Sequence, residues 1–524
     1  MSGMFDSKAD KASRKLARTQ KEEKAKKKTR TIAITVISVL LVFSAVAILI
    51  NSSFIRRVLP VVSIDGVNFT TTEFEFFFNN EYMEYINFLS QFQGMGGTMP
   101  DMNRPLSTQI YNHETGETWA DLITNATFNK MSNLVSLYNA GKASGFVMSE
   151  EQAEEIENDI AMVEIQAMIN RFPSTDSFLQ QMFGTSMNER TYRRIQEFVT
   201  FANSYNEHIR ESFEYSAETL AGYYADSRNQ LDVFTYRQFM IFFDLPFEAD
   251  FDDETDFENA VTEATDNARS SAAAIASGIS SENDLINAAF IYSELYSDPE
   301  STLRLNQGSR LEADTADWLL DDARVYGDTT LIESEQGINI VFFVSRDDNN
   351  YRTAGMRQIL IMREQINPED YPGGETDPDY LAALEQAEND ARDRAEYVHL
   401  LFTAAGGTED ALIGLMDEHS DDNTAGGYYS NISKFPYQST HLNTMKVVQE
   451  IEDWLFDANR VVGDSELIYT SAFGYHLIYF TGLGDLFFEL MADDRMRTRD
   501  HTAWLDGLTP GEPVKRPAFI LVHV

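Results

Sequence analysis

The stretch "DWLLDDARVYGDTTLI" (Asp317–Ile332) returns further along the chain as "DWLFDANRVVGDSELI" (Asp453–Ile468). Both stretches begin with an apolar helical pattern, pass through a glycine-aspartate turn and end in a short β-run. A similarity of this length between two parts of one chain indicates a duplicated structural unit. We therefore expect one domain to be present twice, and this expectation decides the predicted fold.

Further matches extend the repeat in both directions. "YRQFMIFF" (Tyr236–Phe243) corresponds to "MRQILIMR" (Met356–Arg363), and "GINIVFF" (Gly337–Phe343) corresponds to "GYHLIYF" (Gly474–Phe480). Each copy is predicted to run strand, helix, short helix with loop, helix, strand, over residues 233–347 and 353–481. The spacing between matches grows near "GGYYSNISKFPY", which predicts longer loops there in the second copy. Two copies are too few for a propeller or a solenoid.

A helical region precedes the repeat. "VVSIDGVNFTTTEFEFFF" predicts a hairpin at Asp65-Gly66 and then a helix. Further helices are expected, with a capping box at Ser149 and a cap at Ser216. We interpret the aromatic stripe in the first helix as core, with an exposed client groove as the alternative. Residues 61–232 form the predicted helical domain, completed by a helix within 482–510, and 511–524 form a C-terminal tail with a candidate strand at "AFILVHV".

The N-terminal region has the pattern of a membrane anchor. Residues 31–50 carry no charge, and residues 1–30 hold eleven Lys/Arg against four Asp/Glu. As a helix, residues 31–50 would span the roughly 30 Å hydrocarbon layer. The basic segment predicts a cytoplasmic N-terminus, a single transmembrane helix and an extracytoplasmic location for the rest of the chain. A cleaved signal peptide ending near Ala45-Val46-Ala47 is the alternative.

Composition excludes several classes of function. Beyond residue 30 the chain holds 30 Lys/Arg and 80 Asp/Glu, and it contains no cysteine. So acidic a protein repels phosphate backbones, and we expect no nucleic acid as a partner. Disulfides, thiolate metal sites and a cysteine nucleophile are excluded. No hydrolase or metal-site motif occurs, so neither a metal nor a cofactor is expected.

Taken in order, these segments resemble the membrane-anchored parvulin-type foldases of bacteria, the PrsA/SurA-like group. "VVSIDGVNFTTTEFEFFF" is similar to their post-anchor segment, and "YSAETLAGYYAD" to the end of their helical domain. Within 353–481, the family's motifs are matched by "RQIL", "HSDD", "GGYYSNISK" and "SAFGYHLI". The resemblance implies an α+β multidomain protein: a helical chaperone domain and two parvulin-like domains, each a small antiparallel sheet with surrounding helices.

The family catalyses cis-trans isomerisation of X-Pro bonds, and the resemblance implies where a site would lie. In the second copy, His476 matches the last-strand histidine, and Asp422 matches the residue that faces the substrate carbonyl. Ser471 matches the Thr/Ser that hydrogen-bonds this cluster. Gln358 stands where the family has its first-strand histidine, and it can exchange hydrogen bonds but carries no charge. The resemblance also places substrate-binding side chains at Ile451, Tyr429 and Val447.

The first copy departs further from the family's pattern. Gln238 replaces the first histidine, Asn339 replaces the last, and Asp298 is followed by Pro299. We interpret this copy as a domain that kept the fold and lost the site.

The leading hypothesis is therefore an anchored foldase that binds unfolded, proline-containing secreted polypeptides and isomerises X-Pro bonds in the second copy. A chaperone or holdase without catalysis, or an envelope adaptor with inactive parvulin domains, are the alternatives. The sequence does not indicate the oligomeric state.

Overall fold

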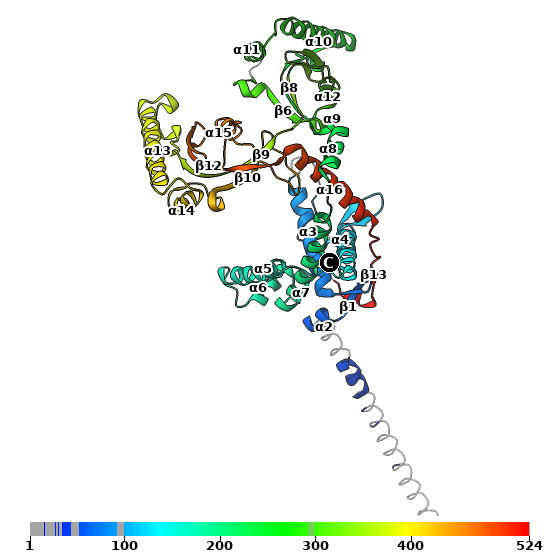
Figure 1. The fold of residues 1–524 in the computed structure, drawn as a ribbon. Coiled ribbons are helices and arrows are strands. Elements are labelled where there is room, and N and C mark those ends of the chain that lie inside the picture. The colour runs from blue at the N-terminus through cyan, green and yellow to red at the C-terminus, as the bar shows by residue number, and fades with distance from the viewer. Residues whose placement is uncertain are drawn as a thin grey trace, which may run out of the picture. The chain divides into compact units, whose positions relative to one another are not determined.

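The computed structural model describes residues 52–91, 99–292, 295–296 and 298–522, with residues 34–42 and positions 15, 27 and 30 before them. The chain is an α+β protein, 56% helix, with four small antiparallel sheets. It divides into two compact units (Figure 1): unit 1 comprises Met1–Phe213 with Asp500–Val524, and unit 2 comprises Glu214–Arg499. Within the described residues, no helix combines the length and the apolar character needed to cross a membrane. Of the predicted anchor only residues 34–42 are described, as a helix, and the remainder lies outside the described residues.

Unit 1 begins with the predicted hairpin. Strands β1 (Pro60–Ile64) and β2 (Val67–Thr70) are joined by Asp65 and Gly66, which both have positive φ. The backbone N–H and hydroxyl of Thr70 donate to the Glu73 carboxylate at 2.8 and 2.9 Å, which fixes the start of helix α3 (Thr71–Gln91). Strand β13 (Val514–Lys515) pairs with β1 on the other side. The C-terminal "AFILVHV" was predicted to form a strand, but residues Pro517–Leu521 form a 3-10 turn.

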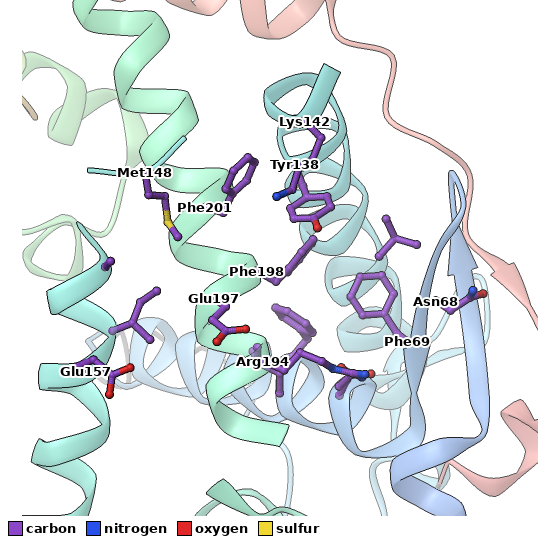
Figure 2. A pocket seen from close by; sticks show the side chains of 16 residues that line it. Asn68, Phe69, Tyr138, Lys142, Met148, Glu157, Arg194, Glu197, Phe198 and Phe201 are labelled. Atoms are coloured by element: carbon purple, nitrogen blue, oxygen red, sulfur yellow. The ribbon is translucent and has the colours of Figure 1, made fainter. Parts of the chain in front are cut away.

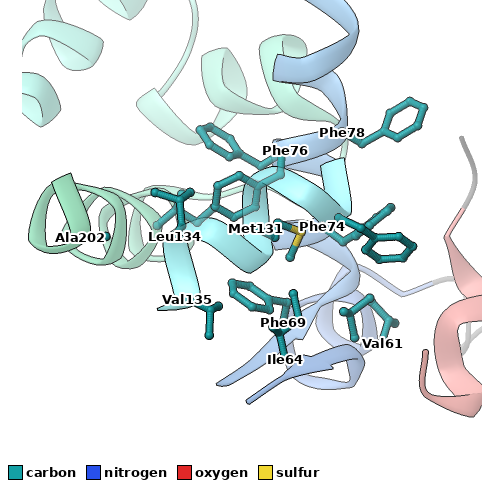
Figure 3. Close-up of a cluster of buried hydrophobic side chains, with 14 of the residues drawn as sticks. Val61, Ile64, Phe69, Phe74, Phe76, Phe78, Met131, Leu134, Val135 and Ala202 are labelled. Carbon is teal, nitrogen blue, oxygen red and sulfur yellow. The ribbon is translucent and has the colours of Figure 1, made fainter. Parts of the chain in front are cut away.

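The remaining helices of unit 1 pack around this hairpin. Figure 3 shows the core, in which side chains from β1, β2, α3 and α4 (Trp119–Ser144) meet. Phe74, Phe77 and Phe78 are buried there, and Tyr82 packs against them, so the interpretation of the aromatic stripe as core is confirmed. The other elements of this unit are α2 (Ser53–Val58), β3 (Ile110–Asn112), β4 (Glu117–Thr118), α5 (Glu150–Ile169), α6 (Thr175–Phe183), α7 (Glu189–Glu211) and the last turns of α16 (Phe487–Gly507). The capping box at Ser149 is present.

Unit 2 contains the duplicated domain, and both copies build the same sheet. Copy 1 (residues 233–347) has strand order β6-β5-β8-β7, and copy 2 (residues 353–481) has order β10-β9-β12-β11. Register also repeats, because Asn339 lies opposite Ile332 in copy 1 and His476 lies opposite Ile468 in copy 2. The strands are β5 (Val233–Phe242), β6 (Leu303–Gln307), β7 (Thr329–Glu333) and β8 (Gly337–Asp347), then β9 (Arg352–Met362), β10 (Tyr428–Ile432), β11 (Ser465–Thr470) and β12 (Gly474–Leu486).

Helices cover the sheets in both copies. In each copy, the two helices after the first strand pack on one sheet face, and the short helix before the third strand packs on the other. These helices are α10 (Glu254–Ala276), α11 (Glu282–Tyr292) and α12 (Ala313–Leu319) in copy 1, and α13 (Pro378–Ala404), α14 (Glu409–His419) and α15 (Gln449–Leu455) in copy 2. Unit 2 also includes α8 (Ala217–Asp226), capped by Ser216 as predicted, and α9 (Arg228–Leu231).

The opening stretch of the repeat forms the same turn twice. Arg324 stacks on Trp318 at 4.7 Å from the ring centroid, and Arg460 stacks on Trp454 at 3.8 Å. Each guanidinium also donates through Nε to the carbonyl oxygen of its own tryptophan. Stacking of a cation on indole combined with a hydrogen bond fixes the side chain firmly. The duplicated sequence is therefore explained by a duplicated local structure.

A second shared feature is an ion pair that joins the sheet to a helix. In copy 1, Arg237 Nε donates to Glu282 at 2.6 Å; in copy 2, Arg357 Nε donates to Glu409 at 2.5 Å. The other end of each guanidinium donates to a loop carbonyl, at Pro299 in copy 1 and at Gly426 in copy 2. Charge-assisted bonds to two different segments hold the loop against the first strand.

The copies differ in the connection between the second strand and the short helix. Copy 1 uses residues 308–312, whereas copy 2 uses residues 433–448, here called the wall loop. The wall loop is held to α16, because the Tyr437 hydroxyl and the Ser439 hydroxyl donate to Asp494 at 2.9 and 3.0 Å. Phe435 and Tyr437 are buried in the core cluster formed by α8 and the first half of α16. The sequence correctly indicated extra residues in this part of the second copy.

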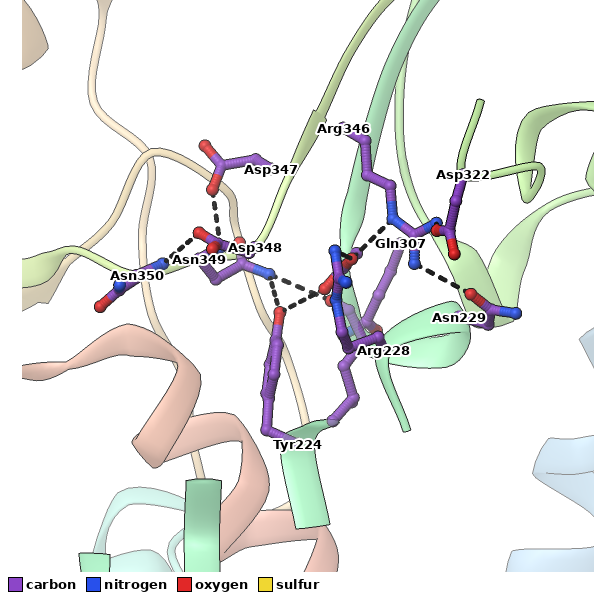
Figure 4. A network of polar contacts seen from close by, with 12 residues as sticks. Tyr224, Arg228, Asn229, Gln307, Asp322, Arg346, Asp347, Asp348, Asn349 and Asn350 are labelled. Atoms are coloured by element: carbon purple, nitrogen blue, oxygen red, sulfur yellow. Dashed lines mark hydrogen bonds and ion pairs between the residues drawn. The ribbon is translucent and has the colours of Figure 1, made fainter. Parts of the chain in front are cut away.

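The segment that connects the two copies is fixed by a buried polar network (Figure 4). The Asp232 carboxylate is fully buried and accepts from the Tyr224 hydroxyl at 2.9 Å and from Arg346 Nε at 2.6 Å. Asn349 has φ of +57° and donates its amide to Tyr224 at 2.8 Å and to the Leu231 carbonyl at 3.1 Å. Burial and the nearby Asp232 raise the pKa of Tyr224, so its hydroxyl stays protonated.

Candidate functional site

A cavity of about 300 Å³ opens on the sheet of copy 2, on the face that α15 and the wall loop cover. Strand β9 supplies Met356, Gln358 and Leu360, which alternate onto this face. The other lining residues are Asp422, Tyr429, Met445, Lys446, Val447, Val448, Ile451, Phe473 and His476. Six of the seven predicted site residues therefore lie together around one cavity.

A directional chain of hydrogen bonds crosses the floor of this cavity. His476 Nδ1 lies 2.9 Å from Gln358 Oε1, and Gln358 Nε2 donates to Asp422 Oδ2 at 2.7 Å. Because the Gln358 oxygen can only accept, the imidazole proton is assigned to Nδ1. Nε2 then accepts from the hydroxyl of Thr470 at 3.0 Å. Protons along the chain thus point from Thr470 through His476 and Gln358 toward the carboxylate.

Burial keeps the histidine neutral. His476 is 5% exposed, and burial lowers its pKa to about 4 from an ordinary value of 6.5. Asp422 and Glu450 act in the opposite direction, but their effect is smaller than that of burial. His476 therefore cannot act as a cation near neutral pH. Its role in this cavity is to fix the orientation of Gln358.

Asp422 supplies the one carboxylate among the residues that line the cavity, and the other charged lining residue, Lys446, pairs with Glu452 at 3.1 Å. Burial opposes its ionisation, but hydrogen bonds from Tyr429, Gln358 and Thr424 together lower its pKa. The Tyr429 hydroxyl donates to Oδ2 at 2.6 Å and the Thr424 backbone N–H donates to Oδ1 at 2.9 Å. Asp422 is therefore an ionised, firmly oriented acceptor at the edge of a largely apolar cavity.

The predicted apolar residues occupy three sides of this cavity. Ile451 is buried on α15 and Val447 is half-buried on the wall loop. Tyr429 lies on β10, where its hydroxyl belongs to the polar chain rather than to the apolar wall. Met356, Met445 and Phe473 were not predicted. Alternation along β9 places Met356 on the same face as Gln358, so the strand pattern in the sequence could have identified Met356. Met445 lies on an irregular loop, and no sequence pattern indicates its position.

Ser471 is the one predicted site residue that the structure does not bring into the cavity. It is exposed in the turn between β11 and β12. The hydroxyl that bonds the imidazole belongs to Thr470, the last residue of β11 and almost fully buried. The prediction was therefore one residue too late, because strand β11 continues to Thr470 before the chain turns.

Copy 1 has the same backbone positions but no equivalent polar chain. Asn339 and Gln238 occupy the positions of His476 and Gln358, and within the described residues no hydrogen bond joins them. Phe234 and Tyr236 are buried where copy 2 has Ala354 and Met356. 

Asp298, the other residue singled out in copy 1, caps a short helical turn by accepting from the Ser301 N–H at 2.9 Å. Larger side chains and a short connection thus stand in copy 1 where copy 2 has its cavity and wall loop.

Unit 1 carries a larger hollow, of about 620 Å³. Figure 2 shows side chains from β2, α4, α5 and α7 around it, among them Phe69, Tyr138, Phe198 and Phe201. The Lys142 ammonium lies 4.2 Å from the centroid of the Phe201 ring. The lining also contains six polar or charged residues: Asn68, Glu73, Lys142, Glu157, Arg194 and Glu197. Aromatic rings beside charged groups suit a bound chain that has both apolar and polar side chains. No sequence motif marked this hollow, because its residues come from five elements, β2, α3, α4, α5 and α7, and from the loop before α5.

Neither of two comparisons with known proteins assigns the chain to a family. No protein-family model matches it, and no curated protein matches it. Within the described residues, no group of three or more His, Asp or Glu side chains is arranged to hold a metal ion. The features that bear on function are therefore the cavity, its hydrogen-bond chain and the repeat.

Proposed function

We propose that the cavity of copy 2 binds proline-containing polypeptide segments and catalyses cis-trans isomerisation of the X-Pro bond. The observation that carries the proposal is the ionised Asp422, held by the His476–Gln358 chain at the edge of a largely apolar cavity of about 300 Å³. A cavity of this size accepts a proline ring with part of the preceding residue.

The chemistry requires no nucleophile and no cofactor. In the planar amide, resonance places negative charge on the carbonyl oxygen, and rotation about the C–N bond removes that charge. A fixed carboxylate near this oxygen raises the energy of the planar amide relative to the twisted one. Apolar walls add to the effect by excluding the water that would solvate the oxygen. Neutral His476 and Gln358 position the carboxylate, and Asp422 faces the substrate.

The proposal includes a setting for this activity. Residues 31–50 anchor the chain in the membrane, and the rest lies on the extracytoplasmic side, where newly secreted polypeptides are its partners. The residue pattern of 31–50 and the basic segment before it support this setting.

A refolding assay tests the isomerase. The full chain should accelerate the proline-limited phase of refolding of a substrate protein, and Ile451→Lys, which places a charged chain in the cavity, should abolish the acceleration. No acceleration by the unaltered protein would rule out isomerase activity.

A second function, binding of unfolded chains without catalysis, is favoured by the aromatic hollow of unit 1. It predicts that the full chain suppresses aggregation of a refolding protein even when Ile451→Lys is present. Loss of suppression with Phe198→Ser and Phe201→Ser, and not with Ile451→Lys, would place chain binding in unit 1. Failure of the unaltered protein to suppress aggregation would exclude this function.

A further inference from the structure

Helix α5 of unit 1 presents large apolar side chains on two opposite faces. Ile156, Ile160 and Ala167 are buried toward the rest of unit 1. On the other side Met162, Ile165, Met168 and Ile169 are between 45% and 68% exposed. At 100° per residue these four side chains fall on one face, opposite to the buried one. We call these four residues the outer stripe.

The outer stripe is not explained by the packing of unit 1. A surface helix normally has a polar outward face, and contiguous apolar side chains on a surface mark a contact site. Two of the four residues are methionines, whose flexible, polarisable side chains adapt to varied partners. In Figure 1, α5 and α6 form a hairpin that packs along α7.

Charge around the outer stripe indicates what it contacts. Helix α5 contains seven acidic residues and no Lys or Arg. Glu151, Glu154 and Glu155 continue the outward face of the stripe toward the helix N-terminus. All three are exposed, and among the described residues none forms an ion pair. From Glu151 to Ile169 the face is about 27 Å long, which equals about eight residues of extended chain.

We propose that this face of α5 is a docking surface for polypeptide segments in which Lys or Arg residues adjoin apolar residues. The apolar part covers Met162, Ile165, Met168 and Ile169, and the cations face the glutamates. The inference rests on the proposed function, because it names the class of client that the foldase selects. An anionic lipid surface fits poorly, because the same glutamates repel it.

Fluorescence anisotropy with synthetic peptides tests the surface on the full chain. The probe alternates pairs of lysine with pairs of leucine, and a matched peptide carries glutamate in place of lysine. We expect the lysine peptide to bind at least about tenfold more tightly than the glutamate peptide at low salt. Equal affinity for the two peptides would overturn the proposal.

Two sets of variants locate the binding. Met168→Ser with Ile169→Ser should weaken binding about tenfold at every salt concentration, because it removes apolar contact. Glu151→Gln, Glu154→Gln and Glu155→Gln together should weaken binding at low salt only and flatten its salt dependence. Two matched controls lie in unit 2. Val461→Ser with Val462→Ser changes an equally exposed apolar pair, and Glu254→Gln, Glu258→Gln and Glu263→Gln change three glutamates on α10.

The proposal would be contradicted if the control variants lost peptide binding, or if the α5 variants kept it in full.

Further measurements separate other occupants and the proposed isomerase. Binding to anionic vesicles that depends on Met168 and Ile169, or self-association that the same serine variants abolish, would assign the face to a membrane or to a second copy. His476→Ala should leave peptide binding unchanged, and the α5 variants should leave isomerisation of a short X-Pro peptide unchanged. Failure of the isomerase therefore leaves a different pattern from failure of the docking surface.

Discussion

The two copies in unit 2 show which parts of a duplicated domain define its fold and which define its site. They share strand order, register, the arginine stacked on tryptophan, and the ion pair from the first strand to the following helix. They differ in the side chains facing the cavity side of the sheet and in the wall loop. The scaffold therefore depends on positions around the edges and turns of the sheet, whereas the cavity depends on a few central positions and one loop.

The largest effect tests the shared scaffold. Arg237→Met and Arg357→Met each leave a carboxylate and a loop carbonyl without their partner. Each should destabilise its own copy by about 3 kcal/mol, since the arginine is largely buried and its removal breaks both a partly exposed ion pair and the bond to the loop carbonyl. Hydrogen exchange of the amides in β5 and β9 measures each copy separately. If one substitution is tolerated and the other is not, the copies do not share this support.

The next effect is a pH dependence that only copy 2 should show. His476 has a folded-state pKa of about 4 and an ordinary value of 6.5, so protonation favours the unfolded state. The stabilisation is complete above pH 6.5 and is lost as the pH falls toward 4, by about 3 kcal/mol. His476→Asn, which installs the residue found in copy 1, should remove this dependence. Hydrogen exchange in β12 and β8 as a function of pH gives the measurement, and equal slopes in the two strands would contradict it.

Catalysis should be confined to copy 2. His476→Ala removes the hydrogen bond that orients Gln358, and Gln358 in turn orients Asp422. The substitution should lower the isomerisation rate about tenfold, which corresponds to a barrier higher by ~1.4 kcal/mol. The matched change Asn339→Ala in copy 1 should leave the rate unchanged. Since neutral His476 only orients Gln358, His476→Gln should restore part of the rate. Equal losses in His476→Ala and Asn339→Ala would show that copy 1 also takes part.

The smallest effect concerns the hydroxyl of Tyr429. Tyr429→Phe removes one hydrogen bond that holds Asp422 ionised, at a cost of about 1 kcal/mol. The Asp422 pKa should rise, so the acidic limb of the activity profile should move to higher pH. Copy 1 has Arg304 at this position, and Arg304→Ala should not alter the profile. An unchanged acidic limb would remove Asp422 from the proposed role.

The repeat made much of this arrangement accessible from sequence. The hairpin at Asp65-Gly66 and the cap at Ser216 follow from local patterns. The neighbourhood of His476, Gln358 and Asp422 was expected from the family resemblance of the second copy. Features that depend on long-range contacts were missed. Thr470 rather than Ser471 bonds the imidazole because of where β11 ends. Met445 reaches the cavity through a loop without periodicity, and no pattern in a single chain announces such a contact.

The network around Asp232 also predicts which positions should vary in amino-acid type among homologous sequences. Asp232, Arg346 and Asn349 serve the junction between the copies, and the last two lie at or beyond the end of copy 1's final strand. Nothing in this network depends on Gln238 or Asn339. Substitutions at those two positions therefore leave the junction between the copies intact. A substitution at Asp232 or at Arg346 would instead leave the other member of this ion pair buried without its partner. Homologous sequences should therefore be diverse at 238 and 339 and nearly invariant at 232, 346 and 349.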